Sequence, residues 1–342
     1  MGFARAIGLA CLLATAAPAV ADAPLVDPAP DPSETETFGY DEARDDRMTI
    51  AVSIGGDGPY RFIIDTGSER TVISRELADS LALVASDDVM LSSVLDIRRV
   101  PTVVIPELGF GRQTMEEVQA PALARRNIGA HGVLGIDALE DHQVVLDFGQ
   151  REMTLTRSRY SDRRSSDNNV IVVRGRTRLG RLVLADARID GTRILAIVDT
   201  GSSFSIGNMA LRDRLVRRGR IDPAQSINVT AITGTSMDIN YTLADRVQIG
   251  RIELRDLPIA FAESELFRQL DLVDRPAMLL GMNALRAFDR VSIDFGNRAL
   301  RLEIPLRGRP ADRQLAWSVP DVSETSLESA SVDIGGEHRN PW

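Results

Sequence analysis

The chain has 342 residues, which is enough for two domains of ordinary size. Its formal net charge of −9 argues against nucleic acid as a partner. All 40 basic residues are arginine and only three residues are histidine, which excludes Ser-Lys catalysis and Schiff-base chemistry, and we expect neither a metal nor a cofactor.

The first 21 residues have the pattern of a secretory signal peptide. Arg5 provides a short positive region, and the apolar segment after it ends in the small residues that a signal peptidase recognises. We therefore expect the chain to be exported and the mature protein to begin at Asp22; a retained N-terminal anchor is the alternative. The only cysteine, Cys11, lies within residues 1–21, so the mature protein would form no disulfide.

A first group of short strands follows a polar leader. Residues 22–46 are rich in Pro, Asp, Glu and Thr, which predicts a flexible leader. In residues 47–155, which we assign to a first repeat, strands at 48–54 and 60–64 are separated by a glycine-rich turn, as in a β-hairpin. The tetrapeptide Asp-Thr-Gly-Ser follows at positions 65–68, and a short helix is predicted after it.

The same order of elements returns later in the chain. Residues 156–169 form a polar, arginine- and serine-rich linker, and residues 170–305 are predicted to form a second repeat. A second Asp-Thr-Gly-Ser occurs at positions 199–202, again after an apolar strand and before a predicted helix. Residues 306–342 are polar and predict a disordered tail.

Further matched motifs indicate an internal duplication. Each tetrapeptide is followed by an apolar-apolar-Gly step, at 133–135 in the first repeat and at 279–281 in the second. Each repeat then contains Asp-Phe-Gly, at 147–149 and 294–296. The aspartates of these two motifs form a second matched acidic pair, which we interpret as turn residues rather than as catalytic residues. Matched motifs in a fixed order are typical of a duplicated domain.

Two facing Asp-Thr-Gly-Ser loops would bring Asp65 and Asp199 together. Two carboxylates a hydrogen bond apart cannot both ionise, so they share a proton and activate a water between them. We expect the glycines to donate backbone N–H groups to the carboxylates, the threonines to tie the loops together, and the serine hydroxyls to bond the outer carboxylate oxygens. These supporting residues are Thr66, Gly67, Ser68, Thr200, Gly201 and Ser202.

On these motifs the chain resembles the aspartic protease clan, both its pepsin-like and its retropepsin-like members. It is most similar to the retropepsin-like periplasmic aspartyl proteases of bacteria, with two repeats fused in one chain, and the resemblance covers residues 48–305. It implies a mostly β, bilobal acid-protease (double-ψ) fold made of two homologous repeats with short helices. It also implies an exported, periplasmic endopeptidase with Asp65 and Asp199 as the catalytic pair.

The resemblance implies a partner and a state of assembly as well. The partner would be a protein or peptide substrate bound in an extended conformation, and the chain would act as a monomeric pseudo-dimer, with no metal and no nucleic acid. The alternatives are a catalytically silent periplasmic peptide-binding module on the same fold, and an enzyme in which each repeat pairs with the same repeat of another chain.

The resemblance finally implies two hairpin flaps over the cleft. The second repeat has a good hairpin with glycine near its tip, and the first has a matching segment, residues 89–96, that lacks glycine. Either only the second flap closes in the usual way, or the first hairpin has another role, such as lining the cleft. The expected substrate-binding residues of the flaps are Ser92, Ser93, Ile232, Thr233, Gly234 and Thr235.

Overall fold

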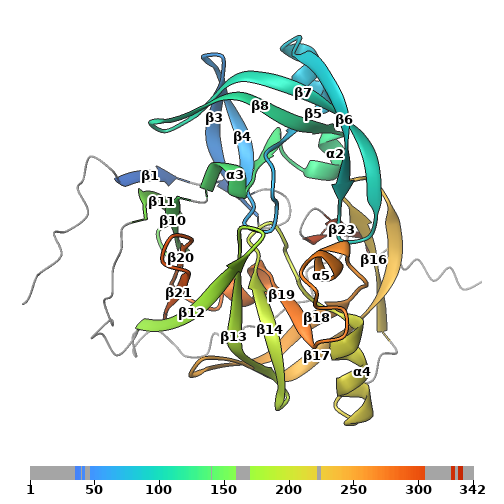
Figure 1. Cartoon of the computed structure of the whole chain (residues 1–342). Coiled ribbons are helices and arrows are strands. Elements are labelled where there is room, and N and C mark those ends of the chain that lie inside the picture. Colours follow the sequence, from blue (N-terminus) through green and yellow to red (C-terminus); the bar gives the residue numbers. More distant parts are fainter. Residues whose placement is uncertain are drawn as a thin grey trace, which may run out of the picture.

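The computed structural model describes residues 35–39, 41–42, 47–139, 141–158, 170–221, 225–304, 325–327 and 330–333. Within these ranges the chain is mostly β and forms two barrel-like units with a few short helices, which confirms the predicted fold class (Figure 1). The predicted signal peptide, much of the leader and most of the linker lie outside the described residues. None of the described helices has the length and the apolar character that crossing a bilayer requires.

The first unit is built from antiparallel hairpins. Strand β3 pairs with β4, and β7 pairs with both β6 and β8. Helix α1 begins after Ser74, whose side chain accepts a hydrogen bond from the backbone N–H of Leu77 at 3.3 Å and so caps the helix. The elements of this unit are β2 (Asp41–Glu42), β3 (Met48–Ile54), β4 (Asp57–Ile64), β5 (Val72–Ser74), α1 (Arg75–Ser80), β6 (Val84–Ser92), β7 (Ile97–Phe110), β8 (Gln113–Leu123), α2 (Arg125–Ile128), β9 (Gly132–Leu134) and α3 (Ile136–Leu139).

The second unit repeats these elements in the same order from β3 onward, which confirms the duplication. Asn208 caps α4 as Ser74 caps α1, because its side chain accepts a hydrogen bond from the backbone N–H of Leu211 at 2.9 Å. The elements are β13 (Arg181–Ile189), β14 (Thr192–Val198), β15 (Ser205–Gly207), α4 (Met209–Arg217), β16 (Gln225–Ala231), β17 (Ser236–Ile249), β18 (Ile252–Phe261), α5 (Glu265–Gln269), β19 (Ala277–Leu280) and α6 (Met282–Leu285).

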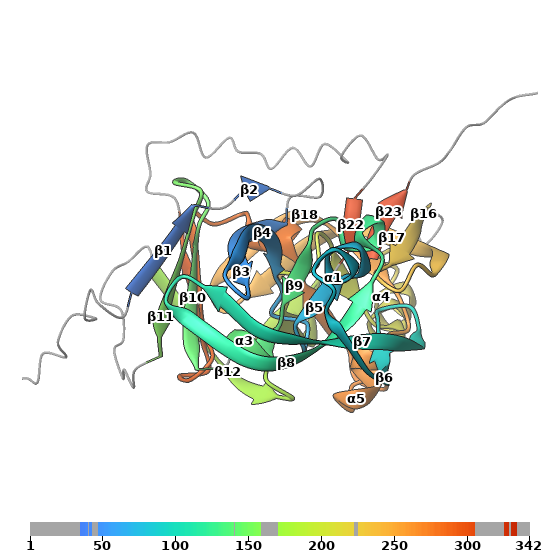
Figure 2. The same ribbon diagram turned by 90° about the horizontal axis from the view of Figure 1, so that it is seen from above.

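A sheet to which both repeats contribute joins the two units. At its centre β10 lies antiparallel to β20, with Val145 opposite Ser292. Figures 1 and 2 both place this sheet to one side of the two units, which it ties together. Its strands, in spatial order, are β1 (Thr35–Gly39), β11 (Glu152–Arg157), β10 (His142–Asp147), β20 (Arg290–Asp294), β21 (Ala299–Glu303) and β12 (Val170–Arg178).

One part of the predicted flexible leader is a strand. β1 pairs antiparallel with β11, where Phe38 lies opposite Met153 and packs against the main apolar core. The Glu36 carboxylate also accepts a hydrogen bond from the backbone N–H of Arg112 at 2.7 Å. The prediction of a leader without structure was therefore wrong for residues 35–39. The polar composition of the whole segment concealed a short Thr-Glu-Thr-Phe stretch that suits a strand.

Two other predicted polar segments also contribute strands. β11 extends to Arg157 and so enters the linker predicted at 156–169. In the tail that was predicted to be disordered, β22 (Thr325–Leu327) and β23 (Ala330–Asp333) form a hairpin, and β23 pairs antiparallel with β16. The edge of a sheet offers unpaired backbone groups, which bind a further strand with little regard to its side chains. Composition alone therefore did not reveal these strands.

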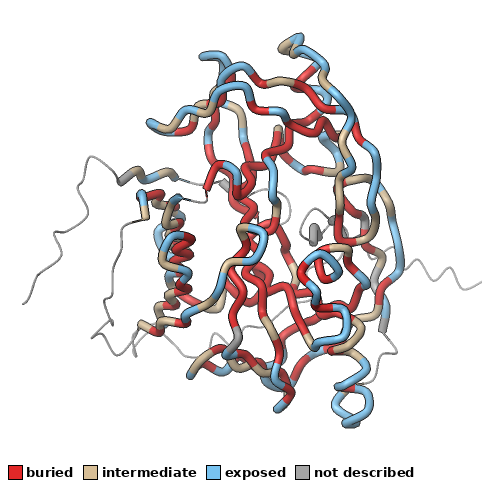
Figure 3. The backbone as a smooth tube through the Cα atoms, viewed as in Figure 1, coloured by how far each residue is buried: buried red, intermediate tan, exposed pale blue. Residues whose placement is uncertain are grey.

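An apolar-apolar-Gly strand passes behind each tetrapeptide loop. β9 runs parallel to β4 and antiparallel to β5, and β19 has the same place beside β14 and β15. A Cβ added at Gly135 would lie 2.5 Å from the carbonyl carbon of Arg70, so this close approach requires glycine. Buried residues follow these strands and the adjoining loops through the middle of the molecule (Figure 3).

The second matched acidic pair caps turns of the shared sheet. Asp147 Oδ1 accepts hydrogen bonds from the backbone N–H groups of Gly149 at 3.0 Å and Gln150 at 2.8 Å. Asp294 Oδ1 accepts one from the backbone N–H of Asn297 at 2.9 Å. These contacts agree with the interpretation of both aspartates as turn residues.

Candidate active site

Two buried strands bring the tetrapeptide loops to the centre of the molecule. β4 and β14 end directly before Asp65 and Asp199, which are 2% and 0% exposed. The backbone N–H groups of these aspartates donate to the carbonyls of Leu134 at 3.0 Å and Leu280 at 3.1 Å, on the strands behind the loops. Each carboxyl group is therefore held at the end of a strand that is itself fixed by packing.

The threonines of the two loops exchange hydrogen bonds. The Thr200 hydroxyl accepts from the backbone N–H of Thr66 at 3.1 Å and donates to the carbonyl of Ile64 at 2.8 Å. The Thr66 hydroxyl accepts from the backbone N–H of Thr200 at 3.1 Å and donates to the carbonyl of Val198 at 3.2 Å. All four contacts are buried, so the loops of the two repeats are locked to each other in a nearly symmetric way.

The glycines allow the carboxyl groups to approach and also bind them. Gly67 donates its backbone N–H to Asp65 Oδ1 at 2.7 Å, and Gly201 donates to Asp199 Oδ1 at 2.9 Å. A Cβ added at Gly201 would overlap the Asp65 carboxyl group, which lies directly against this loop. Any residue larger than glycine at this position would push the two loops apart.

The serine hydroxyls do not bond the outer carboxylate oxygens, and this part of the prediction was wrong. Ser68 Oγ donates to the carbonyl of Arg70 at 2.8 Å, and Ser202 Oγ donates to the carbonyl of Phe204 at 2.5 Å. Within a tight turn, a serine hydroxyl readily reaches a backbone carbonyl two residues further on. The support for Asp65 comes instead from the backbone N–H of Ser68, which donates to its Oδ1 at 3.0 Å.

Burial is the largest influence on the pKa of Asp65 and raises it above its ordinary value. The Gly67 N–H, the positive charges of Arg181 and Arg47, and the side chain of Asp199 act in the opposite direction on this pKa. The Asp65 carboxyl group also lies directly against Gly201, in the loop that carries Asp199. A pair in this position holds one proton in common more readily than it ionises twice.

Arg181 is a charged residue of the site that the sequence did not reveal. It lies at the start of β13 in the second unit, and its side chain is 7% exposed. Its Nε donates to the carbonyl of Gly67 at 2.7 Å, and its Nη1 forms an ion pair with Glu69 Oε1 at 2.7 Å. Arg181 therefore connects the second unit to the loop of Asp65. Among 40 arginines, no local pattern distinguishes it.

A second pair of matched residues supports the loops from behind. The Asp137 carboxylate accepts hydrogen bonds from the backbone N–H and the hydroxyl of Thr71, both at 2.9 Å. In the second unit, the Ser205 hydroxyl donates to Asn283 Oδ1 at 2.8 Å. Asp137 and Asn283 occupy equivalent positions in the matched Gly-x-Asp/Asn-Ala-Leu stretches of the two repeats, and this match is the sequence signal that could have identified them.

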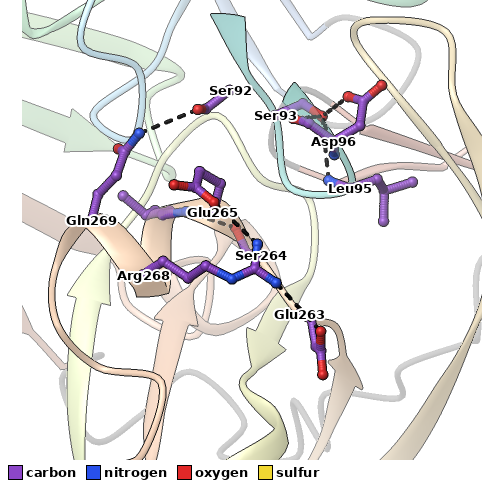
Figure 4. A network of polar contacts seen from close by, with 10 residues as sticks. Ser92, Ser93, Leu95, Asp96, Glu263, Ser264, Glu265, Arg268 and Gln269 are labelled. Atoms are coloured by element: carbon purple, nitrogen blue, oxygen red, sulfur yellow. Dashed lines mark hydrogen bonds and ion pairs between the residues drawn. The ribbon is translucent and has the colours of Figure 1, made fainter. Parts of the chain in front are cut away.

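Both hairpins that were expected to form flaps are present. The first consists of β6 and β7 with its tip at residues 93–96, and the second consists of β16 and β17 with its tip at residues 232–235. Gly234 has a φ of +87°, whereas no residue of the first tip has a positive φ, so the first hairpin needs no glycine. The Ser93 hydroxyl braces the first tip instead, accepting from the backbone N–H groups of Leu95 and Asp96 at 3.2 and 3.1 Å (Figure 4).

A small cavity lies between the first flap and the loop of Asp65. Its volume is about 120 Å³, and its lining includes Asp65, Ser92, Ser93, Val94, Arg181 and Ile232. Of the expected flap residues, Ser92, Ser93 and Ile232 thus face the cavity. Thr233 and Thr235 instead contact the first flap through Asp96. Within the described ranges, no group of three or more His, Cys, Asp or Glu side chains could hold a metal ion.

Comparison with known families gives one match in each repeat. Residues 50–138 match the family described as aspartyl protease. Residues 185–287 match the family described as gag-polyprotein putative aspartyl protease. Each matched segment contains one Asp-Thr-Gly-Ser loop, its apolar-apolar-Gly strand and its flap hairpin. No curated protein matches the chain.

Proposed function

Because the chain belongs to the retropepsin-like aspartyl proteases, with two repeats in one chain, we propose that it is an aspartic endopeptidase with a single intramolecular active site. The observation that carries this proposal is the junction of the two loops. The crossed threonine hydrogen bonds join the two loops, and the Asp65 carboxyl group lies directly against the loop that carries Asp199.

In the proposed reaction, Asp65 and Asp199 share one proton and hold a water between them. The ionised carboxylate takes a proton from this water, whose oxygen attacks the carbonyl carbon of the scissile peptide bond. The protonated carboxyl group donates its proton to the carbonyl oxygen, which gives a neutral tetrahedral diol. A proton then passes to the amide nitrogen, the C–N bond breaks, and a carboxylic acid and an amine leave.

The surroundings of the aspartates suit this chemistry. Burial raises the pKa of Asp65, and this favours the singly protonated pair over the doubly ionised one near neutral pH. The positive charges of Arg181 and Arg47 limit this rise in the pKa of Asp65, so the pair can still lose its shared proton. Activity plotted against pH should therefore give a bell-shaped curve. The substrate would lie extended under the flaps, where backbone pairing can hold a strand of any sequence.

We further propose that the protein is exported and acts in the periplasm as a monomer. Export is supported by the signal-peptide pattern of residues 1–21, and a monomeric enzyme is supported by the fact that both carboxyl groups come from one chain. The alternative of a silent peptide-binding module has no observation in its favour, because both loops keep the aspartate, threonine and glycine that the reaction needs.

The experiment that tests this function is cleavage of an unfolded protein by the mature chain from Asp22, from acidic to neutral pH. Asp65→Asn and Asp199→Asn should each abolish cleavage, because the water is activated only by the pair. Asp147→Asn is a matched control, since it alters a turn aspartate of the shared sheet and should leave cleavage intact. If either dyad variant cleaved as fast as the wild type, the proposed mechanism would be refuted.

A further inference from the structure

Each flap tip inserts an aliphatic side chain into the opposite unit. Val94, in the first flap, is 2% exposed and belongs to an apolar cluster whose other buried members all come from the second unit. Ile232, at the matching place in the second flap, is 4% exposed and belongs to a cluster whose other buried members all come from the first unit. The flaps therefore cross over the cleft, and each is held by the core of the other repeat.

A carboxylate joins the two flaps directly. Asp96, in the first tip, accepts hydrogen bonds from the hydroxyls of Thr233 at 2.7 Å and Thr235 at 2.5 Å, both in the second tip. Its Oδ2 also accepts from Arg98 Nε at 2.7 Å, within its own hairpin. The Asp96 side chain is only 18% exposed. Hydrogen bonds to an ionised carboxylate are stronger than neutral ones, and more so when water is largely excluded.

Each flap also contacts a helix of the opposite unit. Ser92 accepts a hydrogen bond from Gln269 Nε2, on α5, at 3.2 Å (Figure 4). In the second flap, a Cβ added at Gly234 would lie 2.9 Å from Nδ2 of Asn127, on α2. The contacts on the two sides are alike in position, but only the first flap carries the carboxylate that connects the tips.

The space between the first flap and the loop of Asp65 is small. The cavity beside Asp65 has a volume of about 120 Å³. Sites for ligands of drug size have about 300–1,000 Å³. A cavity of this size leaves too little room beside Asp65 for the side chains of an extended peptide while the tips keep this arrangement. The flaps must first move apart.

We propose that Asp96, Thr233 and Thr235 form a latch that holds the free enzyme closed, and that a peptide enters only after this latch opens. The latch is a property of the flaps alone, whereas its effect on catalysis rests on the proposed peptidase function. When only a small fraction of the protein molecules is in the binding-competent state, the apparent affinity for the ligand is the intrinsic affinity multiplied by that fraction. Loosening the latch should therefore raise the open fraction and strengthen peptide binding by the same factor.

A unique thiol can report the opening of the flaps. The mature chain from Asp22 contains no cysteine, so Val94→Cys introduces the only thiol, in a side chain that is buried in the second unit while the latch is closed. A thiol reagent would react only after the first flap lifts. The latch is loosened by Thr233→Val combined with Thr235→Val, which removes both donors to Asp96 and leaves the first tip unchanged.

The labelling rate should rise by at least about tenfold in the loosened variant, because two hydrogen bonds to a charged group are lost. Asn228→Ala is the matched control in the same flap, since it removes an exposed hydrogen bond to Asp238 and leaves the latch in place. Ala120→Cys, on β8 and 0% exposed, reports opening of the core instead. An unchanged rate at position 94, or an equal rise at position 120, would overturn the proposal.

The consequence for catalysis is tested with the same variants and a peptide substrate. The KM of the loosened variant should fall by about the factor by which labelling rises, and kcat should not rise. Faster labelling with an unchanged or higher KM would refute control of substrate access by the latch. If no peptide is cleaved by any form of the protein, the proposed function fails, but the labelling experiment still decides whether the latch exists.

Discussion

The crossed threonines provide the most quantitative test of how the two repeats are joined. In Thr200→Val, the backbone N–H of Thr66 loses its acceptor and the hydroxyl bond to the carbonyl of Ile64 is lost, at almost unchanged side-chain volume. A buried donor left unsatisfied costs about 1–3 kcal/mol, and the second bond contributes about 0.5–1.5 kcal/mol, so we expect a loss of about 1.5–4.5 kcal/mol. Such a loss is a large part of a typical stability of about 5–15 kcal/mol.

The free energy of unfolding is measured in urea by far-UV circular dichroism, together with kcat for a peptide substrate. Displacement of a catalytic loop by 1 Å can cost about 100-fold in rate, so activity should fall together with stability. Thr102→Val is the control, because it removes a partly buried hydroxyl bond of 2.7 Å to the carbonyl of Asp87, far along the first flap hairpin from the loops. If Thr200→Val were no less stable than Thr102→Val, the threonine junction would not hold the loops as argued.

Three further changes have definite expected outcomes. Gly201→Ala should abolish cleavage, because the added Cβ overlaps the Asp65 carboxyl group, whereas Gly39→Ala meets no atom within 4 Å and should be silent in the same assay. Burial raises the pKa of Asp65, so the stability that comes from its protonated form is lost as the pH rises through the folded-state pKa. At neutral pH, Asp65→Asn should therefore unfold at a higher urea concentration than the wild type. An equal or lower unfolding midpoint would contradict this. Arg181→Gln removes a positive charge that lowers the pKa of Asp65, so the acidic limb of the pH–rate profile should move to higher pH. If the acidic limb of this variant did not move, the charge of Arg181 would not act on the pair of aspartates.

The parts of the fold that could be predicted are those encoded by neighbouring residues. The strands before Asp65 and Asp199, the loops themselves and the capped helices after them follow from apolar runs, glycine and cap residues within a few positions. The duplication places the loops in equivalent units, and the two loops exchange matched threonine hydrogen bonds. The general location of the candidate site could therefore be predicted from matched motifs alone.

The parts that could not be predicted depend on contacts between residues far apart in the chain. β1 is a strand because β11, more than a hundred residues later, offers it a partner. Arg181 reaches the loop of Asp65 from the other repeat, and its own neighbourhood in the sequence gives no sign of this. The first flap lacks the glycine that the second flap has, yet its tip turns without a positive φ, because Ser93 and Asp96 supply the hydrogen bonds of the turn.

The serine hydroxyls show a different limit of sequence-based reasoning. The tetrapeptide places Ser68 beside the carboxylate of Asp65, and both its hydroxyl and its backbone N–H could have reached an oxygen. In the folded loop the backbone N–H of Ser68 donates to the carboxylate and its hydroxyl donates to the carbonyl of Arg70. Which group reaches which acceptor depends on the path of the turn. Residue type predicts that such a group will find a partner, but not which one.

The most direct test of the central claim is the shared titration of the two aspartates. The rate of peptide cleavage is measured from acidic to neutral pH for the mature wild type, Asp65→Asn, Asp199→Asn and the control Asp147→Asn, with folding verified by far-UV circular dichroism. A bell-shaped profile for the wild type and the control, with no cleavage by either folded dyad variant, is the predicted result. A folded Asp199→Asn variant that still cleaved at the wild-type rate would contradict the account, because the second repeat would then contribute no catalytic carboxyl group.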